Sequence, residues 1–355
     1  MDERGHCLGA GRVEKDSIKC LVWDLDNTLW RGVLLEDDRV ALRDSAVRVI
    51  KSLDDRGILQ SIASKNESAY AMAKLREFDL QDYFLYPQIT WNSKTASISR
   101  IAELINVGLD SVAFIDDDPV ERAEVGYSLP QVLCIDAGEL DVVLDRPEMN
   151  PRFVTEDSKN RRLLYLRDMR RQQDEGEYVG PKEEFLATLE MVFTISAARE
   201  EDLKRAEELT VRTHQLNSTG YTYSYDELNF YSQSKDHKLF IAELEDRYGS
   251  YGKIGLCLLE CGAGVWTIKL LLMSCRIMSR GVGTIFVNQI MKRARAADVR
   301  LRAEFVPTDR NRIMYVTYKF AGFRELTRNG DLVIFENDLT RFQPCPGYVK
   351  VRFES

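Results

Sequence analysis

The chain lacks the features that would place it in or beyond a membrane. Its 355 residues contain no uninterrupted apolar run long enough to span a bilayer. The first residues, MDERGHCLGAGRVEKDS, contain no apolar signal core. We therefore expect a cytoplasmic protein with no membrane partner.

Disulfide pairing and general nucleic-acid binding are also poorly supported. The seven cysteines are scattered and odd in number, which argues against a disulfide framework in a chain of this size. A net charge of −8 argues against general binding to nucleic acid. The sequence shows no internal repeat and no low-complexity segment. Its 44% hydrophobic and 30% charged residues are ordinary for a globular protein long enough to form two domains.

The first half of the sequence alternates between apolar runs and helical stretches. KCLVW, ILQSIAS, SVAFID and QVLCID are predicted to be buried strands, and helices are expected around 45–55, 67–77 and 95–106. This alternation predicts a parallel sheet with helices on both faces. We assign this domain to residues 17–145, after a loose lead over residues 1–16.

The second half changes its pattern. Prolines near 145–151 interrupt the alternation, and RRLLYLRDMRRQQDEGEYVG has the spacing of a charged amphipathic helix. We therefore assign 146–180 to a helical linker. Over 181–355, helices near 200–213 and 283–297 and further strand-like runs predict a second α/β domain. Those runs are KLFIAEL, IGLCLLE, VWTIKLLLM, LRAEFV and LVIFEN.

Acidic residues follow two of the predicted strands in the first domain. Asp24 and Asp26 come after KCLVW, and the acidic run 116–118 ends SVAFID. Ligands collect beyond the carboxyl ends of parallel strands, so these carboxylates are expected to share one crevice. Clustered carboxylates bind Mg²⁺. Ser64 at a strand end and Lys94 at a helix start are candidates to bind phosphate. Taken singly, either acidic stretch is equally consistent with a surface turn.

The order of these motifs resembles the haloacid dehalogenase (HAD) superfamily over about residues 18–140. That resemblance implies Asp24 as a nucleophile that forms an aspartyl-phosphate, and Asp26 as general acid and base. It also implies Mg²⁺ held by Asp24, the backbone of Asp26 and an acid of the second cluster, with Asp117 preferred to Asp116. About thirty-five residues separate DLDNT from Ser64, too few for a large inserted cap, so a capless Rossmann-like domain is expected. The implied phosphate-binding residues are Ser64, Lys94 and Asn27.

The second domain carries a cysteine beside a loop with two glycines. Cys275 follows WTIKLLLMS, and RIMSRGVGT leads into a predicted helix. Glycines and a helix N-terminus suit a phosphate-bearing ligand, and nearby arginines would favour the nucleophilic thiolate. A buried structural cysteine is the alternative. The stretch resembles the coenzyme A loop of the GNAT acetyltransferases, although Met278 replaces a preferred Arg or Gln. The candidates to bind an acyl or pantetheine group are Arg276, Arg280, Gly281, Gly283 and His214.

Five segments in order resemble the FkbH-like proteins, glyceryl transferase/phosphatases of polyketide and tetronate biosynthesis. They are WDLDNTLWRGVL, IDDDPVERAEV, LTVRTHQLNSTG, LLMSCRIMSRGVG and FVPTDRN, within roughly 18–335. The resemblance implies that 1,3-bisphosphoglycerate is dephosphorylated and that its glyceryl unit passes, through a thioester on Cys275, to the phosphopantetheine thiol of an acyl carrier protein. His214 stands where many relatives have Asn, and either a base or a surface residue fits that position.

Other functions stay open on the sequence alone. A plain phosphatase, an acyl-CoA-dependent acyltransferase and a non-catalytic scaffold for a carrier protein are each consistent with some of the motifs. Acyl carrier proteins are acidic, so a carrier would need a locally basic docking surface. Positive residues beyond the cysteine either form that surface or merely solvate a helix: Arg276, Arg280, Lys292, Arg293, Arg295, Arg300 and Arg302.

Overall fold

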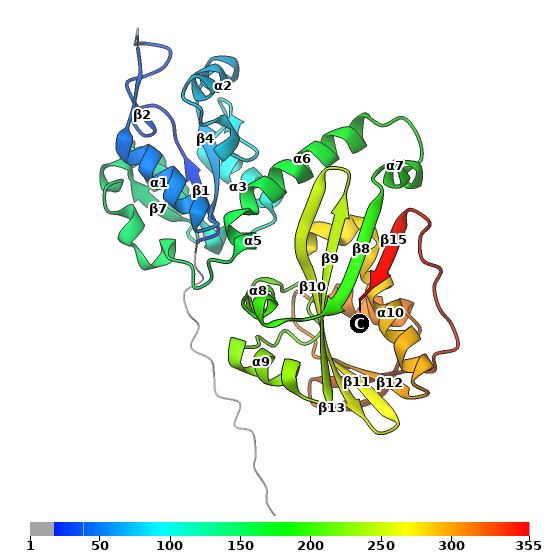
Figure 1. Cartoon of the computed structure of the whole chain (residues 1–355). Helices are drawn as coiled ribbons and strands as arrows, with labels where there is room; N and C mark the ends of the chain where they lie inside the picture. The colour runs from blue at the N-terminus through cyan, green and yellow to red at the C-terminus, as the bar shows by residue number, and fades with distance from the viewer. Residues whose placement is uncertain (1–17, 38, 355) are drawn as a thin grey trace, which may run out of the picture. The chain divides into compact units, whose positions relative to one another are not determined.

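The computed structural model describes residues 18–37 and 39–354, with the side chains of Cys275 and Ser279 excepted. The chain divides into two compact units, Met1–Leu166 and Arg167–Ser355, which are described separately here. Figure 1 follows the chain through both, with the colour passing from blue through cyan to green over the described part of the first unit and from green to red over the second. None of the described helices combines the length and apolarity needed to cross a bilayer.

The first unit is built on a five-stranded parallel sheet. Its strand order is β5-β4-β1-β6-β7. All four residues of the central strand β1 are buried, as the uninterrupted apolar run CLVW predicts. The predicted parallel α/β arrangement is confirmed. The strands are β1 (Cys20–Trp23), β4 (Leu59–Ser64), β5 (Gln88–Ile89), β6 (Val112–Asp116) and β7 (Leu133–Asp136).

Helices connect the parallel strands. In α1 the buried residues Ala46, Val49, Ile50 and Leu53 recur at the spacing of one helical face, which covers the sheet. Asp118 caps α4, and Pro119 occupies its first turn. Between β1 and α1 the described residues form only the two-residue strands β2 (Trp30–Arg31) and β3 (Ala41–Leu42), and the stretch of about twenty residues is too short for a large cap. The helices are α1 (Asp44–Asp55), α2 (Ser68–Glu77), α3 (Lys94–Ile105) and α4 (Pro119–Ser128).

Short helical turns and two helices lead out of the first unit. After β7 come three 3-10 turns between Ala137 and Met149, then α5 (Glu156–Lys159) and α6 (Arg161–Glu177). The division between the two units falls inside α6. The predicted charged helix is present, while the exact extents proposed for the domains stay predictions.

The second unit is built on an eight-stranded mixed sheet with the order β13-β14-β12-β11-β10-β9-β8-β15. Neighbours are antiparallel except the pairs β11–β12 and β8–β15. The strands are β8 (Met191–Ala197), β9 (His237–Asp246), β10 (Gly249–Gly262), β11 (Val265–Met273), β12 (Arg300–Phe305), β13 (Arg324–Asn329), β14 (Leu332–Asn337) and β15 (Val349–Phe353).

Helices pack on both faces of this sheet. A large core joins α10 and α11 to the strands, and a second core joins α8 and α9 to β9, β10 and β11. The predicted α/β class is therefore confirmed for this unit too. Its helices are α7 (Lys182–Thr188), α8 (Glu200–Arg212), α9 (Tyr225–Gln233), α10 (Val282–Ala296) and α11 (Arg312–Phe320), with the 3-10 helix η6 (Cys275–Arg280) before α10.

Candidate functional sites

Three neighbouring strands deliver polar side chains to one edge of the first sheet. Asp24 follows β1 directly, Ser64 ends β4 and Asp116 ends β6. These strands are parallel neighbours in the order β4-β1-β6, so their carboxyl ends lie together. The Asp24 amide also donates to the Ile115 carbonyl at 2.9 Å, which fixes the acid beside β6. Side chains predicted from separate motifs are thereby brought to one place.

The carboxylates of Asp24, Asp116 and Asp117 form a compact cluster. One oxygen from each lies within 4.8 Å of the others. Asp24 and Asp116 are buried, and Asp117 is exposed. Asp117 is held by Thr28, whose hydroxyl donates to Asp117 Oδ1 at 3.3 Å and accepts from the Asp117 amide at 3.0 Å. The geometry thus assembles both acids of the second cluster, Asp116 as well as the preferred Asp117.

Lys94 lies against this cluster as the first residue of α3. Its Nζ forms a short ion pair with Asp24 and lies 3.2 Å from both Asp116 Oδ2 and Glu121 Oε2. The ammonium also donates to the Ala63 carbonyl at 2.8 Å. Lys94 is 3% exposed, so these interactions are shielded from water. A buried cation beside the proposed nucleophile suits the binding of a phosphate dianion.

Burial and charge crowding set the protonation of the cluster. Burial raises the pKa of Asp24, although the Lys94 ammonium opposes the shift. Burial and the Asp24 charge raise the pKa of Asp116 to about 7, against the pull of Lys94. Burial alone would lower the pKa of Lys94, but the charges of Asp24, Asp116 and Glu121 outweigh it and raise that pKa. The cluster therefore carries more negative charge than Lys94 alone can offset.

The donor set fits a divalent cation. Asp116 Oδ2 is buried, and it lies 3.2 Å from Lys94 Nζ as an ion pair without a well-aligned hydrogen bond among the described residues. Such an oxygen has capacity left for a further ligand. Three carboxylates gathered in this way are ligands that Mg²⁺ prefers. Asp24, Asp116 and Asp117 would hold the ion.

Asp26, the predicted general acid, is held by three donors. Its Oδ1 accepts from Trp30 Nε1 at 2.8 Å and from the Leu34 amide at 3.0 Å, and its Oδ2 accepts from Asn66 Nδ2 at 2.9 Å. Trp30 and Asn66 are both buried, so the carboxyl group has a fixed orientation. A fixed carboxyl two residues beyond the nucleophile suits proton transfer to a leaving group.

The other predicted phosphate ligands of this unit have different surroundings. Ser64 is 3% exposed. A hydrogen bond from its hydroxyl to the Asp24 carboxylate acts to lower the pKa of Asp24, against the effect of burial. Asn27 has a left-handed backbone, with φ of 52°, and its Oδ1 accepts from the Gly32 amide at 3.1 Å. The Asn27 side chain therefore shapes the turn after β1, and its phosphate-binding role stays a prediction.

Several contributors to this site were missed by the sequence reasoning: Thr28, Trp30, Lys65, Asn66 and Glu121. Asn66 carried a usable signal, because it lies two residues beyond Ser64 at the same strand end. Glu121 carried a weaker one, in the first turn of α4 directly after the acidic run. It links two lysines, since its other oxygen, Oε1, lies 2.7 Å from Lys65 Nζ.

In the second unit, the predicted cysteine loop lies between β11 and α10. Cys275 begins η6, but its side chain lies outside what the structure describes, so its role stays a prediction. Gly281 has a φ of 74° and caps α10, and a Cβ added there would come within 3.3 Å of Tyr348 Oη. The turn into α10 therefore favours glycine. Gly283 lies in the first turn of α10.

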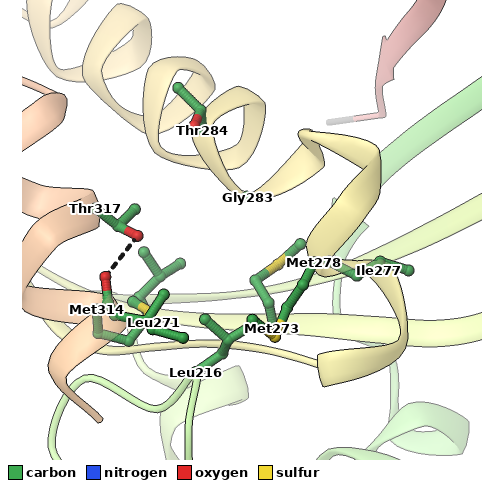
Figure 2. A pocket seen from close by; sticks show the side chains of 10 residues that line it. Leu216, Leu271, Met273, Ile277, Met278, Gly283, Thr284, Met314 and Thr317 are labelled. Carbon is green, nitrogen blue, oxygen red and sulfur yellow. Dashed lines mark hydrogen bonds between the residues drawn. The ribbon is translucent and has the colours of Figure 1, made fainter. Parts of the chain in front are cut away.

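A pocket of about 140 Å³ opens beside this loop (Figure 2). Gly283 and Thr284 border it from α10, and Met273 and Met278 border it from either side of Cys275 in sequence. Side chains on the remaining walls are mainly apolar, so the pocket suits an uncharged, flexible group. The full lining is Leu216, Leu271, Met273, Ile277, Met278, Gly283, Thr284, Ile313, Met314 and Thr317.

The two predicted arginines have partners away from the pocket lining. Arg280 is 4% exposed, and its Nη1 donates to Glu175 of α6 at 3.0 Å. Arg276 Nη2 donates to the Tyr251 carbonyl at 3.0 Å. Neither they nor His214, which is exposed in the loop after α8, are among the residues that line the pocket. Direct ligand binding by these three stays a prediction.

No protein-family profile and no curated protein sequence matches the chain. Several solved structures match part of the chain. The N-terminal part of a Bacteroides fragilis protein containing a phosphatase domain, complexed with Mg, matches 35% of this chain at 29% identity and a TM-score of 0.33. The match spans 38% of that chain.

Two acetyltransferases are also similar to part of the chain. A ribosomal-protein alanine N-acetyltransferase of Escherichia coli matches 42% of this chain and 96% of its own, at 17% identity and a TM-score of 0.35. The PaiA N-acetyltransferase of Thermoplasma acidophilum, in complex with coenzyme A, matches 41% of this chain and 98% of its own, at 18% identity and a TM-score of 0.34. The chain is thus similar in part to a protein with a phosphatase domain and in part to acetyltransferases.

Proposed function

We propose that the chain is a bifunctional glyceryl transferase and phosphatase. Its substrate is 1,3-bisphosphoglycerate, and its product is a glyceryl thioester on the phosphopantetheine arm of an acyl carrier protein. The observation that carries the phosphatase half is the assembly of Asp24, Asp116, Asp117 and the buried Lys94 at one edge of the first sheet. The transferase half is supported by the ordered motifs around Cys275 and by the pocket beside it.

The phosphatase step uses Asp24 as the nucleophile. A carboxylate oxygen of Asp24 attacks phosphorus, an O–P bond forms, and the ester bond to the glyceryl 3-oxygen breaks. Asp26 supplies the proton to the departing oxygen, and water then hydrolyses the aspartyl-phosphate with Asp26 as base. Lys94 offsets charge on the phosphoryl oxygens. Bound Mg²⁺ would supply further charge neutralisation at the carboxylate cluster.

The two phosphates of the substrate differ in chemistry, and the transferase step uses only one of them. Its acyl phosphate is an activated carbonyl, which the Cys275 thiolate attacks, so that a C–S bond forms and inorganic phosphate leaves. Its other phosphate is a stable ester that requires the aspartate site. The carrier thiol then attacks the Cys275 thioester and returns a thiol to the cysteine. One thioester replaces another, so this exchange is close to balanced in energy.

The carrier partner requires a positive docking surface. Lys292 and Arg295 are exposed on α10, while Arg293 packs over the Phe353 ring. Arg302 pairs with Glu336 at 2.8 Å and is less available to a carrier. The proposal therefore concentrates docking on Lys292 and Arg295. Attraction of an acidic carrier to these residues would weaken as salt concentration rises.

Intact-mass spectrometry tests the proposal. The enzyme is incubated with a holo-carrier, 1,3-bisphosphoglycerate and Mg²⁺, and the intact masses of both proteins are measured. We expect a glyceryl increment on the carrier and a covalent adduct on the enzyme. Cys275→Ala should abolish both, and Asp24→Asn should leave a phosphoglyceryl species. A carrier loaded equally well by Cys275→Ala would overturn the covalent step.

Further measurements separate the alternatives. A plain phosphatase predicts phosphate release that is unchanged in Cys275→Ala, with no acyl-enzyme. An acyl-CoA-dependent acyltransferase predicts transfer from acetyl-CoA to an amine. A scaffold predicts that substitutions of Asp24 and Cys275 leave the pathway running. The intact carboxylate and lysine cluster favours the catalytic reading of the first unit.

A further inference from the structure

The strands β11 and β12 of the second unit diverge. They pair in parallel only from Val265–Arg300 to Ile268–Ala303. Beyond these pairs, β11 continues to Met273 and β12 to Phe305, each supported on its outer side by another strand. Diverging parallel strands leave backbone donors and acceptors that an extended ligand can pair with.

Residues 216–218 of the chain occupy this gap themselves. Ser218 N donates to the Leu271 carbonyl at 2.9 Å, and Met273 N donates to the Leu216 carbonyl at 2.9 Å. Across the gap, Val306 N donates to the Ser218 carbonyl at 3.0 Å. Asn217 and Leu272 form an antiparallel bridge. The segment therefore acts as a short strand that bonds to both sides of the opening.

Two side chains hold the segment in place. The Ser218 hydroxyl accepts from Leu271 N at 3.0 Å. Asn311, which is fully buried, donates through Nδ2 to the Asn217 carbonyl at 3.0 Å and to the Val306 carbonyl at 2.9 Å. Its Oδ1 accepts from the Thr308 amide at 2.8 Å. One side chain thus joins the segment to the chain that leaves β12.

The inserted segment changes what the neighbouring pocket offers a ligand. Leu216 of the segment and Leu271 and Met273 of β11 share one region of the lining, opposite Gly283 and Thr284 in Figure 2. The backbone groups that these residues would offer at an open strand edge are already bonded within the protein. The pocket therefore presents mainly apolar side chains in this region.

We propose that residues 216–218 are a built-in strand that stays in place when ligand binds, and that the pantetheine arm is held in the pocket by apolar contact without strand pairing. Asn311 is the positioning residue of that strand. The assignment of the arm as pantetheine rests on the function proposed above. The filling of the gap between β11 and β12 by residues 216–218 rests on the structure alone. Without strand pairing, the isolated arm binds weakly, and the carrier's protein surface must contribute the rest of the affinity.

Hydrogen–deuterium exchange of the full chain with coenzyme A tests the mode of binding, because coenzyme A carries the same arm. We expect half-saturation at about 1 mM or above, as weak binding implies. Ligand should slow exchange in peptides covering 311–320 and leave 213–220 unchanged. Faster exchange over 213–220 would show that ligand displaces the segment and would overturn the proposal. No change anywhere at about 5 mM would overturn the assignment of the arm to this pocket.

Asn311→Ala tests the positioning role without ligand. Exchange over 216–218 should become about tenfold faster, since donors to two carbonyls are lost. The matched control is Asn337→Ala, which removes a buried asparagine that donates to the Ala321 carbonyl at 2.9 Å away from the gap. It should leave 216–218 unchanged. Equal exchange there in the two variants would refute the role of Asn311.

A milder variant and an activity measurement complete the test. Ser218→Ala keeps the backbone bonds and should speed exchange over 216–218 by less than Asn311→Ala does. If carrier loading is observed, Asn311→Ala should raise KM for the holo-carrier more than it lowers kcat, because it disturbs a binding wall. If the unmodified chain fails to load the carrier while residues 216–218 exchange slowly, that result would count against the proposed function but not against the built-in strand.

Discussion

The Oε2 atom of Glu121 lies 3.2 Å from the Nζ atom of Lys94, which makes Glu121 a third carboxylate beside that ammonium. The side chain of Glu121 is 17% exposed, and its second oxygen pairs with Lys65. Burial acts to raise the pKa of Glu121, but Lys65 and Lys94 together outweigh it and lower that pKa. The carboxylate is therefore held as an anion that restrains Lys94, the lysine proposed to bind phosphate.

Glu121→Gln should weaken both the fold and the phosphatase step. Loss of a partly buried charged partner should reduce the free energy of unfolding of the first unit by about 1–2 kcal/mol and kcat/KM by up to about tenfold. Urea unfolding is followed by tryptophan emission in a Trp266→Phe background, which leaves tryptophans only in the first unit. Glu103→Gln, on an exposed pair with Arg100, is the control, and identical behaviour of the two would contradict the restraint.

Lys94→Met should separate metal binding from turnover. Removing the cation leaves Asp24, Asp116 and Asp117 unopposed, so Mg²⁺ should bind about tenfold more tightly or better. Phosphatase kcat should fall by about 10²–10³, because the developing phosphoryl charge loses its ammonium. Titration calorimetry measures the first effect and phosphate release the second. Lys74→Met, which loses a pair with Glu77, should change neither. Weaker Mg²⁺ binding in Lys94→Met would show that the lysine does not compete with the ion.

The raised pKa of Asp116 predicts a pH-dependent stability. In the metal-free fold this carboxyl keeps its proton up to about pH 7, whereas in the unfolded chain it loses the proton near the ordinary aspartate pKa of 3.8. The folded state therefore binds the extra proton, and metal-free stability should fall as pH rises from about 4 to 7 and then level off. Urea unfolding in EDTA measures it. Asp116→Asn should flatten the slope, and an unchanged slope would contradict the assignment.

Mg²⁺ should reverse this dependence. The ion binds the ionised carboxylate, so its affinity should weaken by up to about tenfold for each pH unit below 7. Thermal stabilisation by Mg²⁺ should accordingly be larger at pH 8 than at pH 6. Equal stabilisation at the two pH values would mean that Asp116 is ionised without metal.

The sheet of the first unit and its acidic cluster could be predicted from sequence because the signals are local. The buried strands β1 and β6 are continuous apolar runs, and an acid lies at the end of each run, so the parallel topology alone brings Asp24 and Asp116 together. Glu121 could not be placed in this way. Its contact with Lys94 depends on how α4 is rotated against α3, which no spacing within either helix specifies.

The second unit was harder to predict where pairing is short or remote. β15 alternates between buried and exposed residues and pairs with β8, more than 150 residues earlier, at the edge of the sheet. The inserted segment 216–218 is too short for any strand pattern and gains its backbone hydrogen bonds from β11, Val306 and Asn311, all distant in sequence. The position of Arg280 near the glycines predicts a cation that faces a ligand. In the structure Arg280 pairs instead with Glu175, which lies 105 residues away in sequence.

Trp30→Phe should expose the role of Asp26 as general acid. The substitution keeps the ring in the core but removes the indole donor 2.8 Å from Asp26 Oδ1. Turnover of an alkyl phosphate should fall by about tenfold, because its poor leaving group needs the proton. Turnover of an aryl phosphate, which has a better leaving group, should fall far less. Trp91→Phe, at a side chain that is 67% exposed, is the control. Equal losses for the two substrates would argue that Trp30 is merely structural.

Arg171→Met should destabilise the second unit strongly, because Arg171 neutralises two acids in the interior. Arg171 is fully buried; it donates to both oxygens of Asp246 at 2.7 and 2.8 Å and to Asp168 at 2.7 Å. Methionine fills similar space but leaves both carboxylates without their partner, which should cost about 3–5 kcal/mol. Native-state hydrogen exchange of β9 and β10 reports the loss. Arg247→Met removes an exposed pair with Asp174 and should cost about 1 kcal/mol or less. If β9 and β10 exchange at the same rate in the two variants, the buried pair does not stabilise the packing of α6 on the sheet.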